Sequence, residues 1–489
     1  MSEKNEKTLK SQDDTKNYGL GIRHLQMACM TLNLISLIIA RASMGIAVLA
    51  MSEVDEKNDR NIQVFDWDKN TQSLILSSFF WGYLVMQVPS GILAKRFGGK
   101  SVQLVALASN MVICLLVPTC AAWGGWMLVC ACRASMGLAQ ACLFPSTHTL
   151  LGQWLPENER TSYTGIVYGG VQIGTVIAMP LSGFLADSAI GWKLIFYVVA
   201  GILFVNSIIW YALGANSPRD HRMISIEERI YIEAGLNVHE GKRPPTPWRY
   251  ILRSKEIWAV MGPHFGFALS FVLFFVDMPT YLEKGLNISL KTSAILSALP
   301  YMGMLAGSTF SGFLSEQICN RKLINTTLSR KIFQSISSFG TAGGLLLLSW
   351  LGPEDKTLAV AALVGCLTCS GFSTPGFLVT ELDLSPNYAG VIFSVLNCIV
   401  NVGIVGMPMV TSFILQNDST NISRWKIVFL IMSSICASSN IMFLLFGTAE
   451  RQEWDDPKFL MKMQGNIEES EPVLKLEEKV EKQTEPEEK

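Results

Sequence analysis

Twelve long apolar stretches constrain the fold of this chain more than any other feature of its sequence. A helix that crosses the hydrocarbon core of a bilayer needs roughly 20 mostly apolar residues. Stretches of about that length lie near residues 25–51, 71–94, 101–123, 126–150, 161–186, 190–213, 257–282, 290–314, 332–351, 357–380, 389–415 and 425–447. Strands of membrane barrels are about 10 residues long and alternate in polarity, whereas these stretches are unbroken. The pattern predicts an all-α integral membrane protein with 12 transmembrane helices in a lipid bilayer.

The charge content argues against several other classes of protein. Charged residues make up 16% of the 489 residues, whereas soluble globular chains average about 25%. The formal net charge is −1, so the sequence lacks the basic footprint of a nucleic-acid-binding protein. The closely spaced cysteines, Cys130 with Cys132 and Cys366 with Cys369, have no histidine nearby. We interpret them as small packing residues and expect neither a disulfide framework nor a metal site.

The apolar stretches fall into two groups of six, separated by a polar loop. The loop contains a proline-rich break at 244–247 and a predicted short helix over 224–236, in which Ser225 and Glu228 are spaced as a capping box. Both tails are charged and poor in aromatic residues, which is typical of disordered segments. The predicted organisation is a disordered N-terminal tail (1–24), a six-helix bundle (25–213), a linker (214–256), a second six-helix bundle (257–447) and a charged C-terminal tail (448–489).

Lysine and arginine predict the orientation, because they concentrate in the cytoplasmic loops of membrane proteins. If both termini are cytoplasmic, the inner segments hold 28 of these residues and the outer loops hold 9. The remaining two, Arg41 and Arg133, lie within spans. The excess of 28 over 9 predicts that both termini and the central linker face the cytoplasm.

A short repeat relates the two groups of six spans. Ser90-Gly91-Ile92-Leu93 ends the second span, and Ser311-Gly312-Phe313-Leu314 ends the eighth, 221 residues later. A third copy, Ser182-Gly183-Phe184-Leu185, ends the fifth span. In this organisation the chain resembles the major facilitator superfamily, whose two six-helix halves enclose a binding site near the middle of the membrane.

Longer motifs make the resemblance more specific. They include Arg41-Ala-Ser-Met-Gly-Ile-Ala-Val48, Ser78-Phe-Phe-Trp-Gly-Tyr83, Trp154-Leu-Pro-Glu-Asn-Glu-Arg160, Leu296-Ser-Ala-Leu-Pro-Tyr301 and Leu382-Asp-Leu-Ser-Pro-Asn-Tyr-Ala-Gly390. These motifs resemble the anion–cation symporter branch of that superfamily, which includes type I sodium–phosphate cotransporters, sialin and the vesicular glutamate transporters. The resemblance covers about residues 25–450 and is closest in character to the inorganic phosphate cotransporters. It implies two pseudo-symmetric six-helix bundles and a transport activity.

Two arginines within spans are the candidates for binding a substrate. Arg41 lies about 16 residues into the first span, roughly 24 Å along a helix. Arginine inside a bilayer is costly and usually faces a cavity or a partner, and its planar fork suits carboxylate or phosphate. Arg41 and Arg133 also match arginines of the resembled family. We expect both to bind an anion, with a structural ion pair as the alternative, and Tyr83 to line the pathway.

Departures from the resembled family bear on the coupling ion. Its proton-coupled members carry a glutamate seven residues after the second arginine, where this chain has Gln140, which cannot titrate. This difference favours a drive by sodium or by the membrane potential. Asp277 lies about 20 residues into the seventh span, at a depth similar to that of Arg41. We hypothesise that it neutralises Arg41 when the site is empty and binds Na⁺ or exchanges a proton; the alternative is an aspartate that faces outer headgroups.

Other titratable residues lie near the inner ends of the spans. His148 matches a Pro-x-x-His pattern of the resembled family and is a candidate for gating or proton relay, because imidazole titrates near pH 6.5. The alternative is a hydrogen-bonded histidine at a helix end, and His264 is assigned such a structural role. Glu381 and Asp383 are interpreted as capping or gating charges, together with Lys95, Arg96 and Lys100.

The sequence therefore predicts a secondary active transporter and not an enzyme. The expected substrate is an inorganic or small organic anion, phosphate or carboxylate, moved by alternating access through a monomer. No cofactor is expected beyond Na⁺ or H⁺ as the coupling ion. The alternatives are a proton-coupled, sialin-like transporter of lysosomal or vesicular membranes and a transport-dead receptor or scaffold. Neither tail carries an acidic dileucine signal, which favours the plasma membrane.

The predicted topology can be checked by glycosylation. It places the sequons of Asn287, Asn417 and Asn421 outside and that of Asn325 in the cytoplasm, and only outward sequons can carry glycans. We expect glycosidase treatment to increase the gel mobility of protein from glycosylating cells. Replacing the three outward asparagines with glutamine should abolish this shift, and Asn325→Gln should leave it unchanged. A shift that depends on Asn325 would invert the topology.

Overall fold

The computed structural model describes residues 19–52, 63–67, 69–156, 158–236, 246–288, 296, 298–415, 420–456 and 459. Regular structure in these ranges is helical throughout, mostly α-helix with short 3-10 and π segments. Most of both predicted tails lies outside the described residues, so their disorder and the predicted domain boundaries stay predictions.

The first half of the chain, which we call the N-half, supplies six membrane crossings. Its helices are α2 (Ile22–Ser52), α3 (Lys69–Phe97), α4 (Gly99–Gln140), α5 (Leu143–Trp154), α6 (Arg160–Ala186) and α7 (Trp192–Leu213). The run Gly99–Trp154 is 56 residues long, about 84 Å at 1.5 Å per residue and far more than one crossing needs. Gly125 breaks it with φ 56°, a conformation that a residue without Cβ adopts readily. The run therefore crosses twice.

The second half, the C-half, contains several interrupted helices. Its elements are α10 (Lys255–Val272), the π segment η3 (Leu273–Asp277), α11 (Met278–Thr280), the π segment η4 (Tyr281–Gly285), α13 (Leu299–Asn320), α14 (Thr326–Leu348), α15 (Lys356–Gly371), the π segment η5 (Thr374–Leu378), α16 (Val379–Leu384), α17 (Ala389–Leu415) and α18 (Ile422–Phe446). In η5, Gly376 has a non-helical ψ of −117°. The freed backbone N–H of Phe377 donates to Oε1 of Gln334 at 3.0 Å, which satisfies it inside the membrane.

The described helices account for the predicted number of spans. Nine of them are long and apolar enough to cross a membrane, and one of these is the double crossing Gly99–Trp154. Helices α13 and α14 are more polar but are 22 and 23 residues long, which suffices for a bilayer. They bring the described crossings to twelve and confirm the predicted all-α membrane fold.

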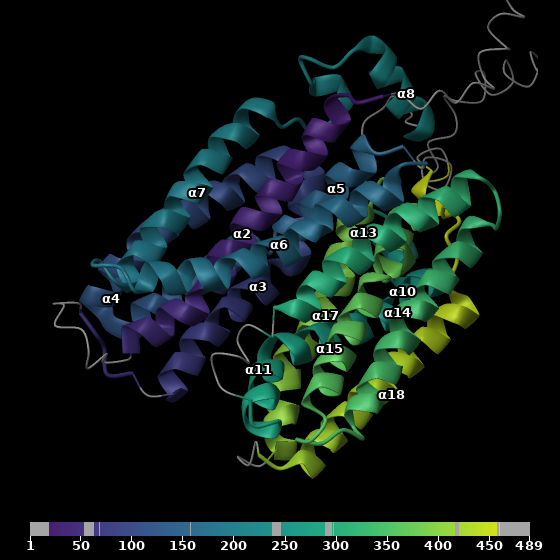
Figure 1. Ribbon diagram of the computed structural model, residues 1–489. Helices are drawn as coiled ribbons and strands as arrows, with labels where there is room; N and C mark the ends of the chain where they lie inside the picture. The colour runs from purple at the N-terminus through teal and green to yellow at the C-terminus, as the bar shows by residue number, and fades with distance from the viewer. Residues whose placement is uncertain are drawn as a thin grey trace, which may run out of the picture.

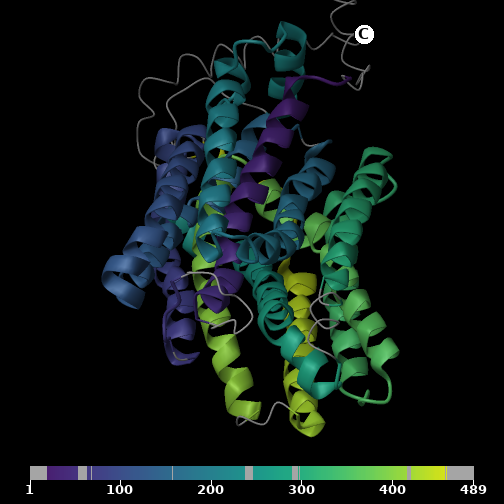
Figure 2. The ribbon, with the colours of Figure 1, turned by 60° about the vertical axis from the view of Figure 1, so that its left-hand side comes forward.

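The two halves lie side by side, the N-half in purple and blue and the C-half in green and yellow (Figures 1 and 2). Each half buries its own apolar cluster, around Trp154 and Trp210 in the N-half and around Tyr281 and Trp425 in the C-half. Between them, α3 packs along α17 and α6 packs along α13. At Gly390 of α17, a Cβ would lie 2.4 Å from a backbone carbonyl oxygen of α5, so glycine permits this close contact.

Helix α8 (Ile226–Leu236) of the linker marks one end of the molecule, which we call the α8 end. Its predicted capping box forms only in part. The backbone N–H of Glu228 donates to Oγ of Ser225 at 3.1 Å. The carboxylate of Glu228 instead accepts from the backbone N–H groups of Ile22 and Arg23, both at 2.9 Å. It therefore caps the start of α2, where helix N–H groups lack helical partners, and it attaches α8 to the N-half.

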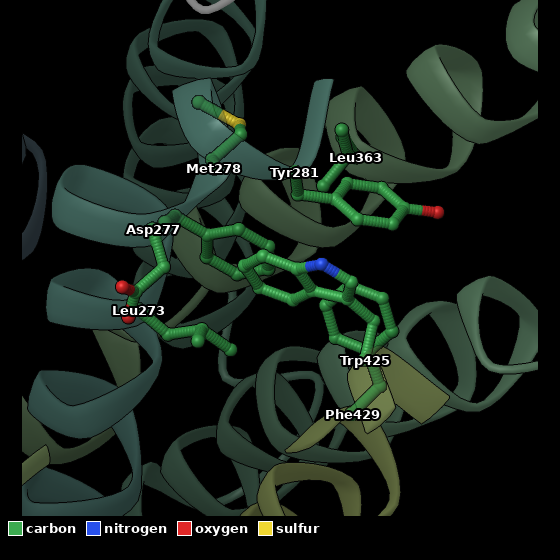
Figure 3. A pocket seen from close by; sticks show the side chains of 8 residues that line it. Leu273, Asp277, Met278, Tyr281, Leu363, Trp425 and Phe429 are labelled. Atoms are coloured by element: carbon green, nitrogen blue, oxygen red, sulfur yellow. The ribbon is translucent and has the colours of Figure 1, made fainter. Parts of the chain in front are cut away.

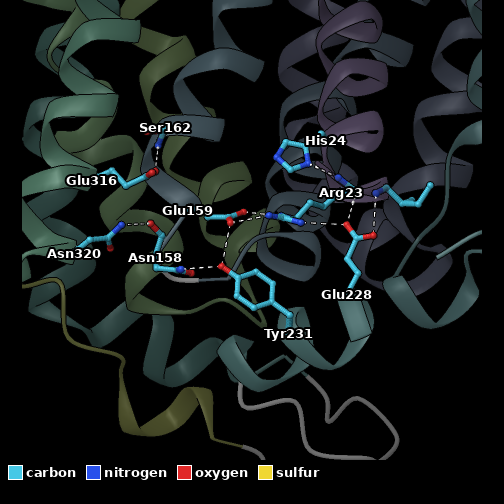
Figure 4. A network of polar contacts seen from close by, with 11 residues as sticks. Arg23, His24, Asn158, Glu159, Ser162, Glu228, Tyr231, Glu316 and Asn320 are labelled. Atoms are coloured by element: carbon cyan, nitrogen blue, oxygen red, sulfur yellow. Dashed lines mark hydrogen bonds and ion pairs between the residues drawn. The ribbon is translucent and has the colours of Figure 1, made fainter. Parts of the chain in front are cut away.

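Arg23 is the centre of a polar network at the α8 end (Figure 4). Its Nε and Nη2 atoms donate to the two carboxylate oxygens of Glu159 at 2.7 and 2.9 Å, and Nη1 donates to Glu228 at 3.4 Å. The side chains of Arg23 and Glu228 are each 2% exposed. The network continues to the C-half, where Asn320 donates to the carbonyl oxygen of Asn158 at 3.1 Å. It thus joins α2, the linker and both halves.

Removing Arg23 should destabilise the protein, because it leaves two carboxylates without a counter-charge. Loss of one partner from a buried pair costs about 3–5 kcal/mol. We expect Arg23→Ala to lower the free energy of unfolding, measured by denaturant titration in mixed micelles, by an amount of that order. Arg229→Ala is the matched control, because its ion pair with Glu233 is 41% exposed at the arginine and exposed pairs contribute about 0–1 kcal/mol. Equal effects of the two variants would contradict this account.

Candidate functional site

Arg41 extends from α2 across the aromatic face of α3. Its guanidinium carbon lies 4.6, 5.1 and 5.4 Å from the ring centroids of Phe79, Phe80 and Tyr83, within the range of cation–π attraction. The side chain is half-buried. The aromatic residues of the second span therefore form a platform that holds this cation inside the membrane.

Arg133 reaches the same platform from α4. Its guanidinium carbon lies 4.9 Å from the centroid of Phe79. Because both guanidinium carbons lie within 5 Å of one ring centroid, they are less than about 10 Å apart. Arg133 is 3% exposed, and its Nε and Nη1 atoms have no hydrogen-bond partner. The structure thus brings the two predicted substrate-binding arginines together.

Close packing of α3 on α4 produces this arrangement. A Cβ added at Gly82 would lie 1.9 Å from the carbonyl oxygen of Ala134, and one at Gly137 would lie 1.9 Å from that of Phe79. Only glycine fits at both positions, since small residues let membrane helices approach closely. The two glycines therefore bring the ring of Phe79 against Arg133.

The two arginines form an uncompensated positive site. Within the described residues, no carboxylate makes an ion pair with Arg41 or Arg133. Buried charge without a partner is costly, and an unpartnered guanidinium fork is suited to a carboxylate or phosphate. Chemically, the site is built to attract an anion.

Tyr83 connects this site to the other half of the molecule. It is 3% exposed, and its hydroxyl accepts from Nδ2 of Asn397 in α17 at 3.3 Å. Sequence analysis selected Tyr83 but missed Asn397. The residues around Asn397 carry no signal that its side chain contacts the second span, because Tyr83 lies 314 residues away in the sequence.

Gln140, at the end of α4, lies within the N-half. Its Nε2 atom donates to Oδ1 of Asn110 at 2.9 Å, and both side chains are buried. This bond joins the two crossings of α4. A role of Gln140 in ion coupling stays a prediction. The hydrogen bond to Asn110 gives a structural reason for a side-chain amide at position 140.

Asp277 ends the π segment η3 in the C-half. Its carboxylate interacts with the hydroxyl of Thr411 in α17, and both this hydroxyl and Oδ2 of Asp277 are buried. A cavity of about 10 Å³ lies beside it, lined mainly by apolar and aromatic residues such as Trp425 and Phe429. Figure 3 shows the carboxylate on the side away from the hydroxyl of Tyr281. The described contacts do not join Asp277 to Arg41, and the hypothesis that Asp277 neutralises Arg41 when the site is empty stays a prediction.

His148 lies at the interface of the halves. Its ring contacts the hydroxyl of Tyr168 in α6 through Nδ1, and its Nε2 atom lies 3.8 Å from Oε2 of Glu381. Oε1 of Glu381 lies 3.0 Å from Nδ1 of His264. The structure thus gathers three titratable residues that the sequence analysis treated separately.

Asp383 closes the interface at the α8 end. Its two carboxylate oxygens pair with Nη1 of Arg160 at 3.1 Å and with Nε of Arg330 at 2.9 Å. Arg160 belongs to the N-half and Arg330 to the C-half, so this buried carboxylate bridges them. Lys95 also lies at this interface, 3.2 Å from the hydroxyl of Thr246 and 4.3 Å from the ring of Tyr388.

The glycosylation candidates are distributed as follows. Asn287 is exposed, with φ 51°, just after η4. Asn421 caps α18, its side chain accepting from the backbone N–H of Ser423 at 3.1 Å. Asn417 lies outside the described residues. Helix α11 and the start of α18, next to which these two sites lie in the sequence, are at the end of the molecule opposite α8 (Figure 1), and the predicted orientation in the membrane stays a prediction.

Two further positions outside the membrane carry shifted pKa values. Neighbouring Arg219 and Arg229 lower the pKa of Glu233 on α8. Burial raises the pKa of Asp455, although Ser385 and Arg451 contact its carboxylate and oppose the shift. Both shifts therefore have local causes, in residues that do not belong to the arginine platform.

Comparison with known proteins decides the family. Residues 32–408 match the sequence family described as "Major Facilitator Superfamily". The chain belongs to this superfamily. It is therefore a multi-pass membrane protein, and its fold is that of a transporter family.

Relatives within the superfamily confirm the predicted branch. The chain is 34% identical over 441 residues to the "Putative inorganic phosphate cotransporter" of Drosophila ananassae, covering 86% of this chain and 91% of that one. It is 33% identical over 391 residues to human sialin, covering 80% and 78%. It is 30% identical over 430 residues to vesicular glutamate transporter 3 of Danio rerio, covering 86% and 72%.

A solved structure supports the superfamily fold. The proton:xylose symporter XylE, bound to 6-bromo-6-deoxy-D-glucose, has a TM-score of 0.68 with 14% sequence identity, covering 88% of this chain and 97% of that one. At this identity the similarity shows the fold alone. Together with the family match, it confirms the two-bundle architecture.

The part assigned to Asp277 can be tested directly. Asp277→Asn keeps the shape of the side chain but removes its charge and its proton. If Asp277 takes part in coupling, the sodium- or pH-dependent component of phosphate uptake into liposomes should fall about tenfold, or ~1.4 kcal/mol. Glu283→Gln, on the neighbouring η4 segment, should have little effect. Unchanged uptake with unchanged sodium and pH dependence in Asp277→Asn would exclude the idea.

Proposed function

We propose that the chain is a secondary active transporter that carries a small anion, inorganic phosphate or a carboxylate, by alternating access between its two halves. The observation that carries this proposal is the pair of guanidiniums, Arg41 and Arg133, over the single ring of Phe79, for which the described residues supply no carboxylate partner. The names of the relatives, which include phosphate and glutamate transporters, agree with an anionic substrate.

The geometry favours an anion that can accept several hydrogen bonds at once. Arg133 presents two buried and unpartnered donors, and Arg41 is half-buried and so stays accessible. Phosphate and carboxylate groups carry two or more oxygens and can bridge two guanidiniums less than about 10 Å apart. A neutral sugar would leave both charges uncompensated.

Contacts between the halves support the alternating-access part of the proposal. The ion pairs of Asp383 join the halves at the α8 end, and Tyr83 contacts Asn397 beside the arginines. An anion bound over Phe79 would lie next to this second contact. We propose that binding there changes the balance between packed and separated halves, since a ligand shifts an equilibrium through its differential affinity.

The remaining parts of the proposal concern drive and location. Gln140 offers no titratable group, which supports sodium or the membrane potential as the drive, with Asp277 as the candidate coupling residue. We propose cytoplasmic termini, a monomer and the plasma membrane. There are two alternative functions. The first is a proton-driven carrier of vesicular or lysosomal membranes, and the second is a receptor that has lost transport. The following experiment distinguishes them from the proposed function.

The experiment is an uptake panel with protein reconstituted into liposomes. Inorganic phosphate, a dicarboxylate, an acidic sugar and urate are each tested with and without a sodium gradient at two pH values. We expect saturable uptake of at least one anion. Arg41→Ala and Arg133→Ala should each raise its half-saturation concentration roughly 10- to 100-fold, because hydrogen bonds to charged groups contribute about 1.5–3 kcal/mol. Arg219→Ala, exposed at the α8 end, is the control.

Two outcomes would count against the proposal. Folded protein that carries no anion under any condition would favour a receptor or scaffold. Uptake that is insensitive to both arginines would move the substrate site elsewhere. Arg41→Lys refines the result, since it keeps the charge but loses the planar fork, and we expect uptake between those of the wild type and Arg41→Ala.

A further inference from the structure

A buried carboxylate at the interface of the halves is surrounded by histidines. Glu381, on α16 of the C-half, is 0% exposed. Its Oε1 atom lies 3.0 Å from Nδ1 of His264 on α10, and its Oε2 atom lies 3.8 Å from Nε2 of His148 on α5 of the N-half. These three residues, which we call the interface cluster, lie on both sides of the boundary between the halves.

Charged groups on the surrounding elements do not neutralise Glu381. On its own helix, Asp383 is occupied with Arg160 and Arg330. On α6, Tyr168 contacts His148 through its hydroxyl. Among the described residues, the only ion-pair partners of Glu381 are therefore the two histidines.

Aromatic rings form the other walls of the interface cluster. The ring of Phe393 on α17 lies 4.4 Å from that of His148, centroid to centroid, and the ring of Phe377 in η5 lies 4.8 Å from that of His264. These walls shield the cluster from water. A carboxylate with an imidazole near each of its oxygens is a chemical setting that can bind a proton.

Charge balance fixes how many protons the cluster needs. One proton must lie between Oε1 of Glu381 and Nδ1 of His264, because a hydrogen bond joins these atoms. If that proton belongs to His264 and His148 is neutral, the cluster has a net charge of −1. A buried net charge is costly. One additional proton makes the cluster neutral.

The geometry also provides a position for that additional proton. Nε2 of His148 and Oε2 of Glu381 face each other across the interface, both buried and both without a hydrogen-bond partner. When the neutral ring carries its proton on Nδ1, where it donates to the hydroxyl of Tyr168, an additional proton on Nε2 creates an N–H⁺ donor for Oε2. Charge-assisted bonds of this kind are about 2.7–2.9 Å long, so a small approach of the halves from the observed 3.8 Å would complete it.

We propose that His148, Glu381 and His264 form a proton-binding site across the two halves, and that a proton bound there holds the α8 end closed. When the halves separate at the α8 end, His148 moves away from Glu381 and the shared proton is lost. Binding and closure are therefore linked, and each favours the other. Low pH favours the closed state, and higher pH releases it.

The consequence for transport rests on the proposed function. If the chain carries anions by alternating access, the proton at the interface cluster regulates how readily the α8 end opens. It lies between the arginine platform and the ion pairs of Asp383, and it adds a pH-sensitive contact to that closure. Anion uptake should then depend on pH through Glu381 even if sodium or the membrane potential provides the drive.

The test measures the separation of the halves without any anion. Full-length protein in lipid nanodiscs carries two fluorophores on azide-bearing amino acids encoded at positions 222 and 323, which are exposed at the α8 end on the two sides of the interface. Single-molecule energy transfer then reports the closed and open populations between pH 5 and pH 8. For one linked proton, the closed-to-open ratio should rise as pH falls, by up to about tenfold per pH unit.

Three variants decide the assignment. Glu381→Gln keeps the size of the side chain but cannot form the charged pair, and His148→Gln keeps a donor near Nε2 that does not titrate. Both should abolish the pH dependence of the closed-to-open ratio. Glu233→Gln, at a half-buried carboxylate on α8 that pairs with Arg219 away from the interface cluster, should retain it. If one of the two cluster variants does not fold, the pH dependence of the closed-to-open ratio in the other still tests the proposal. A wild-type ratio that is independent of pH, or a folded cluster variant with the wild-type response, would overturn the proposal.

Phosphate uptake into liposomes separates this proposal from the proposed function. If the pH response of energy transfer is present and requires Glu381, the proton site stands, even when phosphate and the other anions of the panel are not carried. If anions are carried and Glu381→Gln keeps both the wild-type pH profile of uptake and the pH response of energy transfer, the proton site is wrong and the transport function stands.

Discussion

Two positive charges are held in a low-dielectric interior, and no carboxylate of the described residues pairs with them. This is the constraint on which the functional part of the structure depends. Arg41 and Arg133 share the ring of Phe79, and cation–π attraction offsets only part of the cost of desolvating a guanidinium. The rest must be offset by the packing of the bundles. A negatively charged group bound between the two guanidiniums would offset this cost. Under the proposed function, the transported anion is that group.

The buried charges at the α8 end are compensated, and the contrast is informative. At the α8 end, Arg23 lies between two glutamates and Asp383 lies between two arginines. These pairs are buried and join segments that are far apart in the sequence. Removing one partner from the pairs of Asp383 leaves a buried charge uncompensated, so these pairs favour a closed interface between the halves. The α8 end is thus held by paired charges, while the two arginines of the platform have no ion pair with the described residues; under the proposed function, the transported anion supplies the opposite charge.

The sequence predicted most of the fold because hydropathy in a membrane is a local property. Each span could be located from its own residues, and Arg41 and Arg133 stood out because charges within spans are rare. The interface cluster was not predicted as a unit. Glu381 was interpreted as a gating charge and His264 as structural, since 117 residues separate them and nothing local indicates their contact. Ser225 and Glu228 predicted the start of α8 correctly, but the carboxylate of Glu228 caps α2 instead.

By itself, the sequence determined that the chain crosses a bilayer twelve times, that it belongs with the anion–cation symporters, and which two arginines remain inside the membrane. These conclusions follow from composition and motifs along single helices. Only the tertiary structure decided that both arginines meet over one phenylalanine, that Gly82 and Gly137 make this approach possible, and that a buried glutamate is shared between histidines of opposite halves. The physical reason is that such contacts depend on how helices cross, and a crossing is fixed by the packing of two surfaces that lie far apart in the chain.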